Sequence, residues 1–377
     1  MCDSDLIFMS NPMIHNFRYP VERGKVTFRY SKHDLDVNGL HSVLLFVNSI
    51  HKKFGETHIP ILLDFGNIKI SDKLTLTLLE CICYSLISSY KHNVEISFNC
   101  INTIGNEGIR SSPLLLLGSK RQTRIQDYQA KHKSEIYGNH FRRIVSADAA
   151  QTGDLSAVMG DIDFFLKYFS VIDAYRADIA EVVVELIGNA GEHAKSECIV
   201  DIDITNEYTK DGTGGKYYGV NIAVVNFSET SFIDALRVKI EDPDMHEERY
   251  ELVRKALEFH NEGFTDEYSI DDFYRVAAFQ DRITSRPEKQ KSGGKGLTKL
   301  ICSLEQRSDF HRCYMLSGNR ILWFRQECLE YDDDGWIGFN NSNNFFTCLP
   351  ERTVFSTTTI NFPGTAYNLN FVLKKEE

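Results

Sequence analysis

The sequence lacks the features that mark a secreted or membrane-spanning protein. Its nine cysteines are scattered from Cys2 to Cys348 without a CxxC pair, which predicts reduced thiols rather than a disulfide framework. The first twelve residues contain no basic segment followed by a sustained apolar stretch, so we do not expect them to act as a secretory signal. The most apolar run, 74–87, contains polar residues and is shorter than the roughly 20 residues of a membrane span. We therefore expect a cytoplasmic protein without a membrane segment.

The sequence also lacks the excess of positive charge that general nucleic-acid binders use to displace counterions from phosphates. Its formal net charge is −11 and its isoelectric point is about 5.6. Basic residues do gather in 119–143, but the aromatic residues there are not interleaved with them as stacking platforms. We interpret 116–150 as a polar connector with a solvated helical face, and nucleic-acid contact as the less favoured alternative. The basic residues are Lys120, Arg121, Arg124, Lys131, Lys133, Arg142 and Arg143.

The first 115 of the 377 residues predict a small α/β domain. An apolar run at 59–68 ends in Asp-Phe-Gly-Asn and indicates a buried strand that leaves into a turn. Apolar residues at helical spacing follow an N-cap at Ser71 or Asp72, and 94–98 supplies the next strand. With an earlier helix at 40–53, this order favours a partly parallel sheet.

Residues 62–82 (LLDFGNIKISDKLTLTLLECI) resemble the strand-to-helix step of STAS domains, which are regulatory modules. The resemblance implies a regulatory role for residues 1–115. An Asp after a strand also occurs in other α/β folds, so a domain of another kind stays open.

Residues 174–195 predict an amphipathic helix with polar residues on one face. Glu185, Asn189, Glu192 and His193 lie three or four positions apart, so their side chains neighbour one another. An acid one turn before an amide also occurs on ordinary solvated faces. The order of the residues around them, 185–193 (ELIGNAGEH), is more specific.

This segment resembles the N-box of GHKL ATPases (gyrase, chaperone, histidine kinase, mismatch repair), whose pattern in many histidine kinases is E-L-x-x-N-A-x-x-H. The resemblance implies that Asn189 holds a Mg²⁺ ion that bridges the phosphates of ATP. It also implies that Glu185 orients or deprotonates the attacking water, and it places His193 at the nucleotide. A hard Mg²⁺ ion takes oxygen ligands, and phosphoryl transfer depends chiefly on positioning and charge neutralisation.

Residues 292–301 (SGGKGLTKLI) resemble the G2 box, G-x-G-L-G-L, that precedes a helix in the same family. Glycines let backbone N–H groups approach phosphate oxygens, and the following helix adds its positive end. Thr298 stands where many members have glycine, which changes the phosphate cradle. The resemblance assigns nucleotide contacts to Gly293, Gly294, Lys295, Gly296 and Leu297.

A third segment, 363–371 (PGTAYNLNF), resembles the Gly-Thr turn and last strand of the family and adds Thr365 to the site. The three segments occur in the family's order, with a strand at 199–204 after the N-box. We therefore expect an α+β chain whose residues 151–377 form a GHKL α/β sandwich, with helices on one face of a mixed sheet.

The G1 box, D-x-G-x-G, is altered. After the strand 219–226, Asn226 stands at the position of the Asp that accepts from the adenine amine, and Ser228 and Thr230 replace glycines. An Asn carbonyl still accepts, but a neutral hydrogen bond contributes about 0.5 to 1.5 kcal/mol against about 1.5 to 3 for a charged one. We predict weaker selectivity for adenine.

Residues 231–291 would form the ATP lid. This stretch is too long for a simple loop, and helical spacing at 247–260 and 271–280 predicts two lid helices. Basic residues at its end could reach phosphates or be solvated, and Arg286 is the candidate for a phosphate contact.

The phosphoacceptor His of a two-component kinase is absent from 155–170, where the helix that should carry it is expected. The favoured interpretation is a slow Mg²⁺-dependent ATPase that acts as a conformational switch for a partner protein. Three alternatives stay open: a kinase of the anti-sigma or histidine-kinase-like type, a non-hydrolysing nucleotide-gated module, and a scaffold that binds no nucleotide. The resemblance also implies a homodimer.

Overall fold

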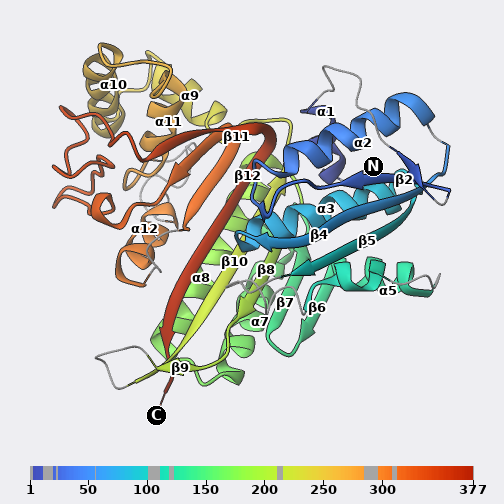
Figure 1. Ribbon diagram of the computed structural model, residues 1–377. Helices are drawn as coiled ribbons and strands as arrows, with labels where there is room; N and C mark the ends of the chain where they lie inside the picture. Colours follow the sequence, from blue (N-terminus) through green and yellow to red (C-terminus); the bar gives the residue numbers. More distant parts are fainter. Residues whose placement is uncertain are drawn as a thin grey trace.

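Two β-sheets and their helices form the α+β fold of the chain, and helix α3 lies between the sheets (Figure 1). No helix among the described residues is both long and apolar enough to cross a membrane. The computed structural model describes residues 3–11, 20–22, 24–55, 57–100, 111–118, 123–209, 215–283, 296–307 and 312–376.

The N-terminal sheet has five strands, and its order along the main path is β1-β2-β4-β3, with β5 paired to β4. Among the described residues three pairings are parallel and one, β1 with β2, is antiparallel, which confirms the partly parallel sheet. Asp72 caps α3 by accepting from the Thr75 amide at 2.8 Å. The elements are β1 (Val21–Glu22), β2 (Lys25–Arg29), β3 (Asp34–Leu35), β4 (Pro60–Ile70), β5 (Asn93–Cys100), η1 (Asp3–Asp5), α1 (Leu6–Met9), α2 (Leu40–Phe54) and α3 (Lys73–Ser88).

The second sheet has seven strands in the order β11-β12-β10-β8-β7-β6, with β9 paired to β10. Every pairing among the described residues is antiparallel, which differs from the predicted mixed sheet. Strands such as β6 and β7 follow one another through tight turns, which only antiparallel pairing allows. The strands are β6 (Ser134–Tyr137), β7 (His140–Val145), β8 (Cys198–Ile204), β9 (Tyr208–Thr209), β10 (Lys216–Phe227), β11 (Tyr314–Trp323) and β12 (Phe355–Lys374).

The stretch 116–150 differs from the predicted connector because it completes this sheet. It holds the end of η2 (Pro113–Gly118), α5 (Thr123–Lys133), β6, β7 and the start of α6 (Ala149–Thr152). Strand β7 pairs with β8 from His140↔Asp203 to Val145↔Cys198. The weak apolar periodicity has a physical cause: β7 places charged residues against buried acids instead of presenting an apolar stripe.

Helices cover both faces of the seven-stranded sheet (Figure 1). Helices α7 (Asp154–Tyr168), α8 (Asp173–Asn189) and α12 (Gly296–Arg307) lie on one face, where Val200 and Ile202 of β8 join their core. The sequence predicted helices on this one face only. On the opposite face, Ile199 joins the core that α3 shares with the N-terminal sheet. All of α3 from Lys73 to Ile87 is buried. The two units therefore share a hydrophobic core.

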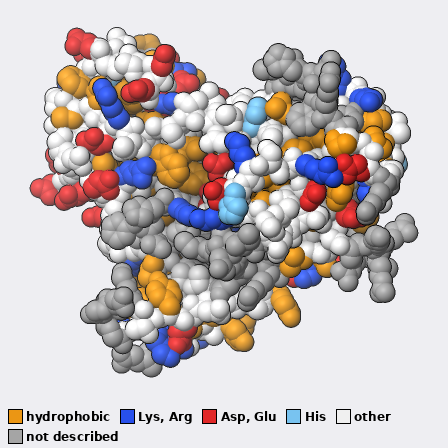
Figure 2. Space-filling view, in the orientation of Figure 1, with side chains coloured by type: hydrophobic (Ala, Val, Ile, Leu, Met, Phe, Trp, Pro, Cys, Tyr) orange, Lys and Arg blue, Asp and Glu red, His pale blue; other side chains and the backbone are white. Residues whose placement is uncertain are grey.

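The described part of the predicted lid, 231–283, folds into a helical lobe with three helices rather than two. Its helices are α9 (Asp234–Glu241), α10 (Glu248–Asn261) and α11 (Ile270–Ala278). His260 bonds to the Phe345 carbonyl at 2.8 Å, and Arg320 of β11 reaches Asp272 at 2.6 Å. These contacts tie the lobe to the sheet. Figure 2 shows acidic side chains over this lobe. Its exposed acids include Glu241, Asp244, Glu248 and Glu251.

Candidate functional site

The predicted N-box lies at the C-terminal end of α8. The α-helix ends at Asn189 and continues as one π-helical turn, Ala190–Ala194, which Lys195 closes in the left-handed conformation (φ 50°, ψ 38°). Single π-helical turns are frequent at functional sites because they change where side chains point. Glu185 is exposed and Asn189 is half-buried, so both side chains are accessible to a ligand.

Gly191 allows this π-helical turn to approach the backbone that follows β7. A Cβ at this position would lie 2.7 Å from the Ala147 carbonyl oxygen, closer than real Cβ atoms come. A larger residue would push the end of α8 away from the sheet. Gly191 therefore has a packing role.

Helix α12 lies against α8 in the antiparallel direction. Lys299 pairs with Glu181, and Arg307 pairs with Asp178 at 2.8 Å. Positions further along α12 thus meet positions further back along α8. By this register, the start of α12 at Gly296 lies beside the C-terminal end of α8, where Glu185 and Asn189 are.

The end of β10 reaches the same place. Asn226 is paired with Thr365 of β12, and the Ser228 hydroxyl donates to the Ala194 carbonyl at 3.3 Å, at the end of the π-helical turn. Gly364 has a φ of 105°, and a Cβ there would clash with the carbonyl of Asn226. Only glycine lets the two strands meet so closely at this point.

Asn226 is buried, and its amide nitrogen donates to the Ser196 hydroxyl at 3.3 Å. Its carbonyl oxygen is the atom that could accept from a base. The hydroxyls of Ser228 and Thr230, which replace the glycines of the G1 pattern, hydrogen-bond to each other at 2.9 Å. The turn after β10 is thus held by side chains rather than by a glycine-rich backbone.

Several residues predicted for the site therefore converge. The structure brings Glu185, Asn189, Asn226 and Thr365 to one end of the helical layer, and Gly296 starts α12 there. Leu297 is half-buried and packs on the core. The remaining predicted residues, Arg286, Gly293, Gly294, Lys295 and the side chain of His193, lie outside the described residues.

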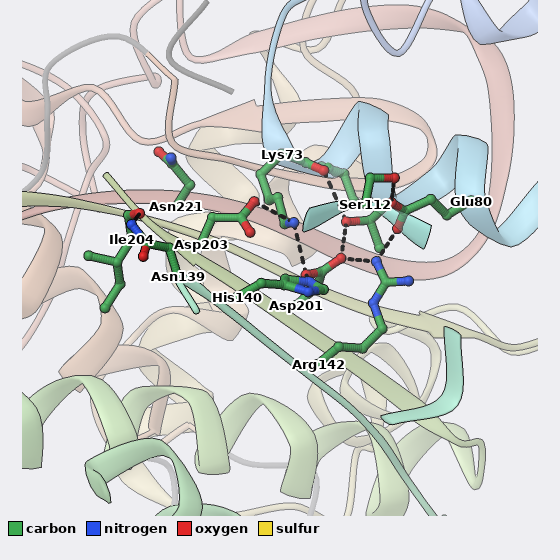
Figure 3. A network of polar contacts seen from close by, with 12 residues as sticks. Lys73, Glu80, Ser112, Asn139, His140, Arg142, Asp201, Asp203, Ile204 and Asn221 are labelled. Atoms are coloured by element: carbon green, nitrogen blue, oxygen red, sulfur yellow. Dashed lines mark hydrogen bonds and ion pairs between the residues drawn. The ribbon is translucent and has the colours of Figure 1, made fainter. Parts of the chain in front are cut away.

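A second polar cluster, which sequence reasoning missed, lies on the opposite face of the sheet under α3 (Figure 3). Lys73 of α3 contacts Asp201 at 2.8 Å and Asp203 at 2.5 Å, and Arg142 of β7 pairs with both Asp201 and Glu80. These side chains are buried, so the charges are withdrawn from water. Three cationic and three anionic side chains balance one another: Lys73, His140 and Arg142 against Glu80, Asp201 and Asp203.

The charges in this cluster shift each other's pKa values. Burial alone would lower the pKa of His140, but the Asp201 carboxylate, 2.7 Å from Nε2, raises it to about 9. Burial would raise the pKa of Asp201, but Arg142 and Lys73 hold it well below its usual range. The cluster is therefore a set of mutually stabilised ions, and Arg142 is not the solvated residue predicted from the sequence.

His140, Asp201 and Asp203 place ligand atoms within 4.8 Å of one another, as a metal site would. The Lys73 ammonium, however, already contacts both carboxylates. The ammonium supplies the positive charge that a metal ion would otherwise bring. We therefore interpret this cluster as a structural one, which holds α3 on the sheet. Its sequence signal was the alternation of two acids in a buried strand, CIVDIDI at 198–204.

No protein-family model, no curated protein and no solved structure matched the chain.

Proposed function

We propose that the chain is a GHKL-type ATP-binding protein, a slow Mg²⁺-dependent ATPase that acts as a conformational switch for a partner protein. The observation that supports this most is the convergence of four segments distant in sequence. The end of α8, the turn after β10, the Gly364-Thr365 step and the start of α12 all lie at one end of the helical layer. They follow the chain order of the N-box, G1, G2 and Gly-Thr segments.

The chemistry of the polar groups suits this role. The Asn189 carboxamide offers the kind of oxygen that Mg²⁺ accepts while it keeps several waters. Glu185 is one turn earlier and exposed, so it can reach a water molecule as general base. The first turn of an α-helix has backbone N–H groups without partners inside the helix, so the N-terminal end of α12 suits phosphate oxygens.

Adenine would lie near Asn226. The Asn226 amide donates to Ser196, which leaves its carbonyl oxygen to accept from the adenine amino group. Because this hydrogen bond is between neutral groups, we expect modest discrimination between ATP and GTP.

The central experiment is calorimetric titration of the full chain with ATP, with and without Mg²⁺. We expect Asn189→Ala to weaken Mg²⁺-dependent binding at least about tenfold, or about 1.4 kcal/mol. Asn261→Ala, an exposed Asn at the end of α10, is the matched control and should bind like the wild type. If the wild type binds neither ATP nor GTP, the chain is a scaffold with a GHKL-like arrangement and the proposal fails.

A second substitution separates turnover from binding. Glu185→Gln should retain ATP binding and lower phosphate release at least about 100-fold, because general-base catalysis contributes roughly that much or more. The exposed Glu258→Gln on α10 is its control. Equal phosphate release by wild type and Glu185→Gln would remove the hydrolytic role and leave a nucleotide-gated module.

The switch cannot involve ordering of the whole predicted lid. Residues 231–283 are packed into the lobe and tied to β11 through Asp272 and Arg320. A nucleotide-dependent change would therefore act on the position of this lobe as a unit.

A further inference from the structure

Strand β12 continues beyond its neighbour β10 at the end of the sheet where the proposed nucleotide site lies. The pairing of the two strands stops at Phe227 and Gly364, whereas β12 already begins at Phe355. Backbone N–H and C=O groups in a folded chain are almost always hydrogen-bonded. Those of 355–362 on this edge of β12 therefore take their hydrogen bonds from groups other than β10.

Two asparagines from the N-terminal part of the chain supply such groups. Asn11 Oδ1 accepts from the Asn361 amide at 2.7 Å, and Asn11 Nδ2 donates to the Asn361 carbonyl at 2.8 Å. The Asn11 side chain thus makes both hydrogen bonds that a residue of a neighbouring antiparallel strand would make. Earlier on the same edge, the Thr359 amide donates to Asn38 Oδ1 at 2.9 Å. The edge of β12 is therefore completed by side chains in place of a strand.

Asn11 is itself fixed to the N-terminal part of the chain. It is 6% exposed, and its Nδ2 also donates to the Ile7 carbonyl at 2.8 Å. The Asn48 amide group on α2 donates to the Phe8 carbonyl at 3.2 Å and to the Asn11 carbonyl. Ile7 and Phe8 are buried in the core of the N-terminal sheet, and α1 and α2 lie beside β12 (Figure 1). The position of Asn11 therefore follows that of α1 and α2.

The part of β12 that Asn11 holds leads directly into the proposed nucleotide site. Gly364 and Thr365 come shortly after Asn361, and Thr365 is paired with Asn226. On the other edge of β12, the Gly364 carbonyl accepts from the Ser317 hydroxyl of β11 at 2.8 Å. Because Gly364 already approaches Asn226 as closely as only glycine allows, a small shift of β12 at Asn361 changes how Asn226 faces a ligand.

We propose that Asn11 is a positioning residue for the nucleotide site, and that the N-terminal part of the chain sets nucleotide affinity through it. Asn11 holds β12 at Asn361, so that Thr365 stays paired with Asn226 and the Asn226 carbonyl faces the base. Movement of α1 or α2 would therefore reach the site along β12. This inference rests on the proposed function, because it concerns affinity at the same site.

Calorimetric titration with ATP and Mg²⁺, together with steady-state phosphate release, tests the effect on the site. Asn11→Ala should raise the dissociation constant about 3- to 10-fold, because the base contact is a single neutral hydrogen bond. Phosphate release at saturating ATP should stay within about twofold of the wild type, since the general base, Glu185, is on α8. A role in stability alone would lower the melting temperature and leave the dissociation constant and KM unchanged, and that result would overturn the proposal.

The double variant Asn11→Ala with Asn226→Ala tests the route. If Asn11 acts through the base contact, its effect on ATP affinity should fall below about twofold once Asn226 no longer offers an acceptor. Asn99→Ala is the control, because it removes a comparable 3.0 Å contact with Asn67 on the N-terminal sheet and should bind ATP like the wild type. An undiminished effect of Asn11→Ala in the Asn226→Ala background would contradict transmission along β12.

Amide hydrogen exchange without nucleotide reports on β12 itself. In Asn11→Ala the amides of Thr365 and Ala366 should exchange at least about tenfold faster, because this end of β12 opens locally more often. Asn38→Ala removes exposed contacts and should act in the same direction by about threefold, even if Asn11→Ala does not fold. Asn99→Ala should leave this exchange unchanged.

The exchange measurement separates a failure of this inference from a failure of the proposed function. If the wild type binds no nucleotide, the proposed function fails, and faster exchange in Asn11→Ala still assigns the positioning of Gly364 and Thr365 to Asn11. Unchanged exchange in Asn11→Ala and Asn38→Ala would overturn the inference, whatever the protein binds.

Discussion

The two faces of the seven-stranded sheet use polar residues in opposite ways. Under α3, Arg142, Asp201 and their neighbours are buried and fixed by one another. On the α8 face the strands contribute mainly apolar residues, and the polar groups of the candidate site lie at the end of α8, where Glu185 and Asn189 are accessible. Polar groups that satisfy each other position an element, whereas accessible polar groups can act on a ligand.

Because of this difference, shifted pKa values do not identify the candidate site in this protein. The large shifts are those of the α3 face, such as His140 and Asp201, and perturbed pKa values often mark functional sites. Here they result from ion pairs that are already complete. Accessibility and the convergence of segments are therefore the better guides to the candidate site.

The largest effect should come from breaking the buried network. Arg142→Ala leaves Glu80 and Asp201 without their shared cation, which should lower the free energy of unfolding by about 3 to 5 kcal/mol. Arg143→Ala, one residue on, removes a partly exposed pair with Asp161 and should cost less than about 1 kcal/mol. Urea unfolding followed by circular dichroism measures both, and similar losses would argue against a distinct role for the α3 face.

The next effect is a pH dependence of stability. The folded pKa of His140, about 9, is above its usual value near 6.5, so the folded state holds a proton that the unfolded state loses. Its contribution is present below pH 6.5 and is lost as the pH rises to 9, with a slope of at most about 1.4 kcal/mol per pH unit.

His140→Gln should flatten this decline, whereas His33→Gln, at an exposed position, should not. The readout is the difference between slopes, because burial also raises the pKa of Cys198 to about 12 and adds a loss of stability above about pH 8.5. Identical slopes for wild type and His140→Gln would show that His140 is neutral in the folded protein.

The backbone of the candidate site gives a smaller effect. Gly364→Ala combines a φ of 105° with a clash against Asn226, and should lower the free energy of unfolding by at least about 2 kcal/mol. Gly24→Ala also has a positive φ, 76°, but open space around it, and should cost about 1 kcal/mol. Thermal unfolding measures the change in melting temperature for each variant. Equal changes would mean that β10 and β12 can move apart at Gly364 without a loss of stability.

The smallest expected effect is a change in ATP affinity through the contact between Asn226 and the adenine base. Asn226→Asp restores a charged acceptor, and we expect ATP affinity to rise about fivefold, or roughly 1 kcal/mol, with a smaller change for GTP. The Ser196 hydroxyl can donate to the new carboxylate, so the turn should persist. Asn261→Asp on α10 is the control in the same titration. A loss of ATP affinity in Asn226→Asp would place the base elsewhere.

Much of the local structure could be predicted from residue patterns. The helix at 40–53, the N-cap at Asp72 and the helix at 174–195 follow from spacing and capping chemistry, which act between near neighbours. The sequence also predicts the second lid helix, at 271–280, and the structure has this helix at Ile270–Ala278. The eight-residue helix α9 was missed because a segment this short carries only two turns of periodicity.

The sequence by itself determined the local elements and the order of the segments that resemble a GHKL nucleotide site. Only the tertiary structure decided that 134–145 belongs to the sheet, that all pairings in that sheet are antiparallel, and that α3 closes its second face. The physical reason is that Arg142 and Asp201 look solvent-exposed by composition and become interior residues only when α3 supplies Lys73 and Glu80 from elsewhere in the chain. The alternating acids of 198–204 do not indicate which cations they will contact, because those cations lie far away in the sequence.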